Sequence, residues 1–164
     1  MKTLVLYYSR TGKTAETAKT LAIKLGSDLI EVTDSKSRNS PLGYISASMD
    51  AFRENKTKTS PSSVDLSSYG LIYIGSPVWA GKPSPAIISI IDKCNFQNKD
   101  VILFVTFGGS GGKKTIERMR EKIEMRGGRM INSFSIKTAG KSTHEISKET
   151  KKLIEEMDLK IYES

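Results

Sequence analysis

The first 26 residues of the chain place a short apolar run, a polar turn and an amphipathic segment in direct succession. Residues 3–8 (TLVLYY) are apolar and rich in β-formers, which predicts a buried central strand. In residues 15–25, alanine and leucine side chains recur at a spacing that puts them on one face of a helix. The sequence therefore predicts a strand, a tight turn and a helix.

The turn between these elements, residues 9–14 (SRTGKT), gathers hydroxyl groups, two cations and a glycine at the start of the helix. Unpaired backbone N–H groups and the helix dipole attract anions at such a position, and a phosphate is the natural candidate. A nucleoside-triphosphate P-loop would need a glycine where the chain has Tyr7, and a dinucleotide loop would need more glycines than Gly12. An ordinary helix start, with Thr11 as the N-cap, stays open as an alternative.

Further strand-like and helix-like segments alternate along the rest of the chain. Strands are expected over residues 28–33, 71–74, 101–107 and 130–138, and helices over residues 44–53, 85–94, 113–126 and 145–158. With the opening unit, this alternation predicts a single domain, residues 1–164, of the α/β class. Its five strands should form a three-layer, doubly wound parallel sheet.

Two unusual loops are expected at the carboxyl ends of the third and fourth strands, where ligands bind in such sheets. The first, residues 75–83, carries Trp79, the only tryptophan, which could offer a planar surface for stacking or could pack onto the helix below. The second, residues 106–112, contains four glycines, which would let backbone N–H groups approach a ligand closely.

Together these segments resemble the cofactor loops of the flavodoxins and flavodoxin-like reductases. Ser9, Thr11, Gly12 and Thr14 match the flavodoxin phosphate loop, Ser/Thr-x-Thr-Gly-x-Thr, whereas Lys13 stands where many flavodoxins have asparagine. The resemblance covers nearly the whole chain, is closest to the shorter members of the family, and implies the strand order 2-1-3-4-5.

The resemblance also implies an FMN cofactor, on which the redox chemistry takes place, and no metal. The hydroxyls and N–H groups of the first turn would hold the phosphate, Trp79 would stack on the ring, and a carbonyl near Ala80 or Gly81 would accept a hydrogen bond from the reduced ring. The residues implied to bind the cofactor are Ser9, Arg10, Thr11, Gly12, Lys13, Thr14, Pro77, Val78, Trp79, Ala80, Gly81, Phe107, Gly108, Gly109, Gly111 and Gly112.

Charge and cysteine content indicate the partners and the compartment. The chain has 26 Lys and Arg against 18 Asp and Glu, a net charge of +8, which favours an acidic redox partner. NAD(P)H or a quinone are further candidate reactants, whereas nucleic acid is not expected because the cations are mostly interleaved with glutamates. A single cysteine, Cys94, and the lack of a membrane-spanning run favour the cytoplasm.

Two functions therefore follow. The first is an FMN-binding protein that mediates electron transfer, as a low-potential carrier or a small flavin reductase. The second is a flavin-free module of the same fold that uses its basic loops to bind a phosphorylated ligand or RNA. The first requires that the turns after the first, third and fourth strands converge on one pocket and that Trp79 is accessible from it.

Overall fold

The computed structural model describes residues 1–35, 49 and 56–163, with residues 158–163 described by their backbone only. Its main sheet has the strand order β2-β1-β5-β7-β8, and all pairs along this path are parallel. Counted along the chain this is the expected order 2-1-3-4-5, so the predicted fold class is confirmed. The strands are β1 (Lys2–Tyr7), β2 (Asp28–Glu31), β5 (Tyr69–Trp79), β7 (Asp100–Phe107) and β8 (Arg129–Lys137).

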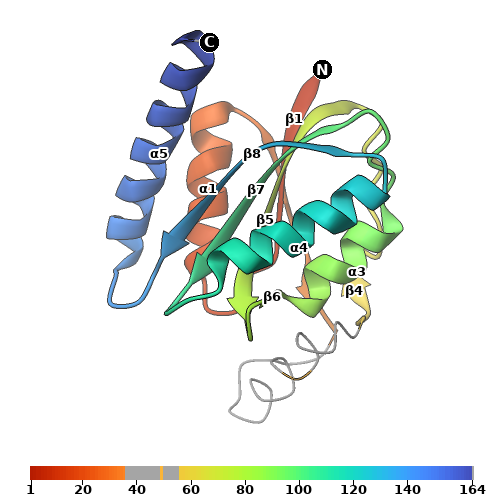
Figure 1. The fold of residues 1–164 in the computed structure, drawn as a ribbon, viewed down its shortest axis with the longest axis horizontal. Coiled ribbons are helices and arrows are strands. Elements are labelled where there is room, and N and C mark those ends of the chain that lie inside the picture. Colours follow the sequence, from red (N-terminus) through yellow and green to blue (C-terminus); the bar gives the residue numbers. More distant parts are fainter. Residues whose placement is uncertain (36–48, 50–55, 164) are drawn as a thin grey trace.

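Helices cover both faces of this sheet, which gives the three layers (Figure 1). Side chains of α1 and α5 pack in one hydrophobic cluster on one face, and side chains of α3 and α4 pack in a second cluster on the other. None of the helices among the described residues is long and apolar enough to cross a membrane. The helices are α1 (Lys13–Leu25), α3 (Pro85–Lys93), α4 (Gly112–Met125) and α5 (Thr143–Glu163).

The centre of the sheet is built around a glycine and two aromatic rings. Gly75, Phe104 and Phe134 are aligned in register on β5, β7 and β8. The rings of Phe104 and Phe134 are stacked, with centroids 5.5 Å apart. A Cβ added to Gly75 would lie 2.1 Å from Phe104 Cζ, so the phenyl ring fills the space that a side chain would need. Gly75 is therefore a packing residue inside a strand.

The third strand was predicted to end at Ile74, and this prediction is wrong. The sequence predicted a strand over residues 71–74 followed by a loop over residues 75–83. The structure continues β5 through them to Trp79 and returns the chain antiparallel as β6 (Lys82–Pro83). The connecting residues, Ala80 and Gly81, both have positive φ angles, 50° and 71°, as a two-residue type I′ hairpin requires.

The segment after β2 differs from the prediction as well. A two-stranded antiparallel ribbon joins β3 (Thr33–Asp34) to β4 (Thr59–Ser60) beside the main sheet. The helix expected over residues 44–53 lies outside the described residues, apart from Met49.

The packing of Gly75 gives a test of the fold. Gly75→Ala should lower the free energy of unfolding by about 1–3 kcal/mol, because the new methyl group overlaps Phe104 in a close-packed core. Urea denaturation followed by circular dichroism measures the change. Gly109→Ala is the matched control, since a Cβ there meets no atom within 4 Å, and its effect should stay within about 1 kcal/mol. Equal effects of the two substitutions would contradict this account of the core.

Candidate functional site

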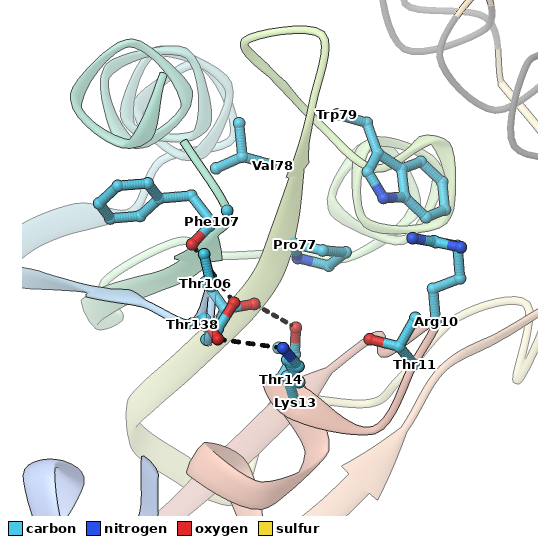
Figure 2. Close-up of a pocket in the computed structure, with 12 residues that line it drawn as sticks. Arg10, Thr11, Lys13, Thr14, Pro77, Val78, Trp79, Thr106, Phe107 and Thr138 are labelled. Carbon is cyan, nitrogen blue, oxygen red and sulfur yellow. Dashed lines mark hydrogen bonds between the residues drawn. The ribbon is translucent and has the colours of Figure 1, made fainter. Parts of the chain in front are cut away.

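A cavity of about 330 Å³ opens where β1, β5, β7 and β8 end at one edge of the sheet. Its size falls in the range of small-molecule sites. Figure 2 shows Arg10 and Trp79 on one side of this cavity, Val78 and Phe107 on the other, and the start of α1 below them. The lining residues are Arg10, Thr11, Lys13, Thr14, Pro77, Val78, Trp79, Thr106, Phe107, Gly108, Thr138 and Ala139.

The start of α1 is built to receive an anion. Gly12 is the N-cap, in the left-handed conformation with φ of 92°, and among the described residues no side chain accepts a hydrogen bond as its cap. The alternative with Thr11 as a capping residue is therefore wrong. By contrast, Ser84 caps α3, where its Oγ accepts a hydrogen bond from Ile87 N at 3.4 Å. The N–H groups of the first turn of α1 thus have no capping side chain, at a helix start where Lys13 and Thr14 line the cavity.

Ser9 stabilises this turn through a hydrogen bond within it. Its Oγ accepts a hydrogen bond from Gly12 N at 3.1 Å, so the hydroxyl closes the turn and does not line the cavity. The turn is anchored to the sheet as well, because Tyr8 N donates to Gly75 O at 3.2 Å. Burial, together with Glu31, raises the pKa of Tyr7 to about 12, so the last side chain of β1 stays uncharged.

Hydrogen bonds join the separate turns beneath the cavity. The hydroxyls of Thr14 and Thr106 lie 2.7 Å apart in a buried pair, in which either oxygen could be the donor (Figure 2). Lys13 Nζ donates to Thr138 O at 3.0 Å, and Thr138 N donates to Phe107 O at 2.8 Å. These bonds connect the ends of β7 and β8 to the first turn of α1. Lys13, which departs from the flavodoxin pattern, thus links the first turn of α1 to the turn after β8.

The glycine-rich segment after β7 brings a second helix start to the same place. Gly111, with φ of 95°, is the N-cap of α4, and again no described side chain caps it. A Cβ at Gly111 would lie 3.0 Å from Gly81 Cα and 3.2 Å from Val78 Cγ1. The tip of the β5–β6 hairpin therefore touches the turn before α4. The turns after β1, β5 and β7 converge as the cofactor hypothesis requires.

Trp79 does not lie as expected. It ends β5 instead of lying in a loop, its side chain is only 3% exposed, and its ring meets the Tyr8 ring edge to face at 5.4 Å. It contributes to the wall of the cavity, but in this conformation the ring packs with the core and offers no open stacking surface. The requirement that Trp79 be accessible from the pocket is therefore met only in part, because the residue lines the cavity while its ring is buried. Stacking of Trp79 on a ligand stays a prediction that requires the ring to turn toward the cavity.

The remaining predicted residues divide into lining and supporting groups. Besides Trp79, the structure places Arg10, Thr11, Lys13, Thr14, Pro77, Val78, Phe107 and Gly108 on the cavity wall. Outside the wall, in the turns that shape it, are Ser9, Gly12, Ala80, Gly81, Gly109, Gly111 and Gly112.

Thr138 and Ala139, which line the cavity from the turn after β8, were not predicted as site residues, and Thr106 was predicted only as the start of a segment. The predicted end of the fifth strand could have identified these residues, because the carboxyl ends of parallel strands lie at one edge of the sheet.

The charge of the cavity wall is positive. Arg10 and Lys13 line it, and no carboxylate does so among the residues that the structure describes. The same described residues contain no cluster of three or more His, Cys, Asp or Glu side chains that could hold a metal ion. The arrangement is thus a positively charged helix start on one side and an apolar slot of Pro77, Val78 and Phe107 on the other.

Solved structures similar to this chain are named flavoproteins or flavodoxins. A flavoprotein from Lactobacillus acidophilus, solved in complex with FMN, is 29% identical, with a TM-score of 0.67 over 82% of this chain and 92% of that one. A protein from Bacteroides uniformis that is thought to be a flavoprotein is 25% identical, with a TM-score of 0.70 over 92% and 97%. Oxidised flavodoxin 2 from Bacillus cereus is 18% identical, with a TM-score of 0.60 over 95% and 99%, and shows the fold alone.

Comparison with sequence families agrees with these structures. None of the curated proteins compared with the chain is significantly similar to it. A family model described as flavodoxin, however, matches residues 2–147, which include all of the turns that form the cavity. The strand order, the converging turns and this match together establish that the chain belongs to the flavodoxin family.

Proposed function

We propose that this protein binds FMN in the cavity at the carboxyl edge of its sheet and uses it to transfer electrons. One observation carries the proposal: the uncapped start of α1 and the turns after β5 and β7 share a single cavity. This combination suits a ligand with an anionic tail and a flat ring. The flavoprotein of Lactobacillus acidophilus, which is solved with FMN, supports the choice of cofactor.

The residues present fit the two ends of such a ligand. The phosphate would lie at the start of α1, near the backbone of Thr11 to Thr14 and the cation of Arg10. The ring would lie in the part of the cavity beside the ends of β5 and β7, where Pro77, Val78 and Phe107 provide apolar walls. FMN supplies the redox chemistry when it is bound, and the protein binds and orients it.

Electron transfer is favoured over acid–base chemistry on an organic substrate. Among the described residues that line the cavity, none is a histidine, cysteine, aspartate or glutamate. General acid–base catalysis uses side chains of these types most often, within hydrogen-bond reach of the substrate. We therefore propose an electron carrier first and a small flavin reductase second. A cytoplasmic location is proposed with it, because Cys94 is a free, buried thiol.

Titration with flavins tests the cofactor assignment. The purified protein, freed of any bound flavin, should quench the fluorescence of added FMN and yield a yellow complex. Riboflavin, which lacks the phosphate, should bind more weakly, because it makes no contact with the start of α1. Protein that does not quench FMN fluorescence would overturn the proposal.

Substitution of Thr14 tests whether this turn holds the phosphate. Thr14→Val should weaken FMN binding by about 10- to 100-fold, the equivalent of a lost hydrogen bond to a charged group, and should change riboflavin binding little. Thr106→Val is the matched control, since it breaks the same 2.7 Å hydroxyl pair but keeps the hydroxyl at the helix start. Isothermal titration calorimetry measures both ligands. Equal losses of FMN and riboflavin in Thr14→Val would show that the turn does not bind phosphate.

Lys13 should influence the reduction potential. Reduction adds negative charge to the bound cofactor, and a nearby ammonium group stabilises that charge. Lys13→Gln should therefore lower the midpoint potential by about 20–40 mV, the equivalent of roughly 0.5–1 kcal/mol for one electron. Lys19→Gln, on the exposed side of α1 outside the cavity wall, is the control and should leave the potential nearly unchanged. Spectroelectrochemical titration measures both, and a higher potential in Lys13→Gln would contradict the expectation.

A further inference from the structure

The two ends of the sheet differ sharply in charge. The turns at the carboxyl end, residues 8–14, 76–84, 106–115 and 137–144, contain seven cations and no carboxylate. The described turns at the amino end, residues 26–28, 61–68, 94–100 and 126–129, contain three cations and three carboxylates. Most of the net charge of +8 is therefore concentrated around the cavity. The cations of the carboxyl end are Arg10, Lys13, Lys82, Lys113, Lys114, Lys137 and Lys141.

Three of these lysines are exposed and available to a partner. Lys13 is held by Thr138 O, and Lys141 forms an ion pair with Glu149 at 2.6 Å. Lys113, Lys114 and Lys137 are exposed, and the structure gives them no carboxylate partner within the residues it describes. We call these three lysines the basic rim.

The basic rim surrounds the start of α4, beside the cavity. Lys113 and Lys114 lie in the first turn of α4, directly after the glycines that follow Phe107. Lys137 is paired in register with Phe107, and it shares a face of β8 with Ser135, because side chains alternate along a strand. A Cβ at Gly112 would lie 3.6 Å from Ser135 Cβ, so this face of β8 borders the start of α4. Phe107, Gly108 and Thr138 connect the rim to the cavity wall.

Placing lysines there lowers the stability of α4. The N-terminus of a helix carries a partial positive charge, so cations in the first turn are repelled. The first turn of α4 contains no acidic residue, whereas α1 has Glu16 and α5 has Glu145 at the equivalent place. Glu145 also forms a capping box with Ser142. Helix stability therefore does not account for Lys113 and Lys114 in the first turn of α4.

We propose that the basic rim is the docking surface for an acidic redox protein, with which the cofactor exchanges electrons one at a time. In each exchange the donor loses one electron and the acceptor gains one. The inference rests on the proposed function, since it names the partner of the same site. Charge complementarity of this kind steers encounter and orients the two proteins, and salt screens it.

The observations favour a protein over a nucleic acid as the occupant. Single-stranded nucleic acid is bound by exposed aromatic rings beside cations. Phe107, which is paired in register with Lys137, is half-buried in the cavity wall, Tyr8 and Trp79 are buried, and the exposed large hydrophobic side chains among the described residues include no aromatic ring. A positive surface without fully exposed aromatic rings suits an acidic protein surface.

The test compares two double substitutions that remove the same charge. Lys113→Gln with Lys114→Gln changes the basic rim, and Lys151→Gln with Lys152→Gln changes an exposed pair on α5. The probe is an acidic plant-type [2Fe–2S] ferredoxin, whose potential of about −400 mV lets it act as the electron donor. Stopped-flow absorbance gives the rate constant for reduction of the FMN-loaded protein, and calorimetry gives the affinity of the oxidised pair.

The rim variant should react about 2- to 10-fold more slowly than the native protein at low ionic strength, with the difference lost in high salt. The α5 variant should stay within about 1.5-fold of the native rate, because its charges are remote from the cavity. Equal effects of both pairs, or a rate that does not depend on salt, would overturn the proposal. Circular dichroism should show no loss of helix in the rim variant, and Lys137→Gln gives an independent variant of the same surface.

A single-stranded RNA of ten nucleotides tests the other class of partner. If it binds more tightly than ferredoxin and the rim substitutions abolish that binding, the surface serves nucleic acid and the proposal is wrong. If the protein does not bind FMN but binds ferredoxin in a way that depends on the basic rim, the docking surface stands and the proposed function is overturned. If the protein binds FMN but the rim substitutions do not change ferredoxin binding, the proposed function stands and the docking surface is overturned.

Discussion

Parallel pairing of the central strands is the constraint on which the site depends. Since β1, β5, β7 and β8 run in one direction, their turns leave the sheet at one edge, although they are far apart in the sequence. Hydrogen bonds then hold these turns together, from Thr138 to Phe107 and from Lys13 to Thr138. The close packing of Gly75 beneath Phe104 supports the same register from within the sheet. The cavity is thus a product of the sheet rather than of any single loop.

The helix starts at this edge differ from helix starts elsewhere in the chain. At the starts of α3 and α5, the hydroxyl oxygens of Ser84 and Ser142 accept hydrogen bonds from backbone N–H groups. Glycine in the left-handed conformation begins α1 and α4, which leaves their first N–H groups to other acceptors. A glycine cap is only a few tenths of a kcal/mol less stable than a capping side chain, so the cost is small where a ligand or partner would supply the anion. Positive potential is therefore concentrated at one end of the molecule by backbone conformation as well as by lysines.

Much of this architecture could be predicted from local patterns, because apolar runs and helical spacing identify buried strands and amphipathic helices directly. The turn after β1 was predicted in the same way, since its hydroxyls and Gly12 are adjacent in the sequence. The errors arose where a residue's role depends on distant neighbours. Gly75 resembles a breaker until Phe104 is known to lie over it, and Trp79 resembles a loop residue until β5 is seen to extend as far as Trp79. Thr138 was missed because its contacts with Lys13 and Phe107 span long stretches of chain.

The contact between Gly81 and Gly111 has a consequence for the evolution of the family. The two turns touch through their backbones, so a side chain at Gly111 would collide with the hairpin tip. An insertion or a bulkier residue in one turn would displace the other, and the shape of the cavity that Val78 lines beside them would change. Descendants of this sequence should accordingly alter the two turns together, as a co-evolving pair, whereas the outer surfaces of the helices remain free to diverge independently.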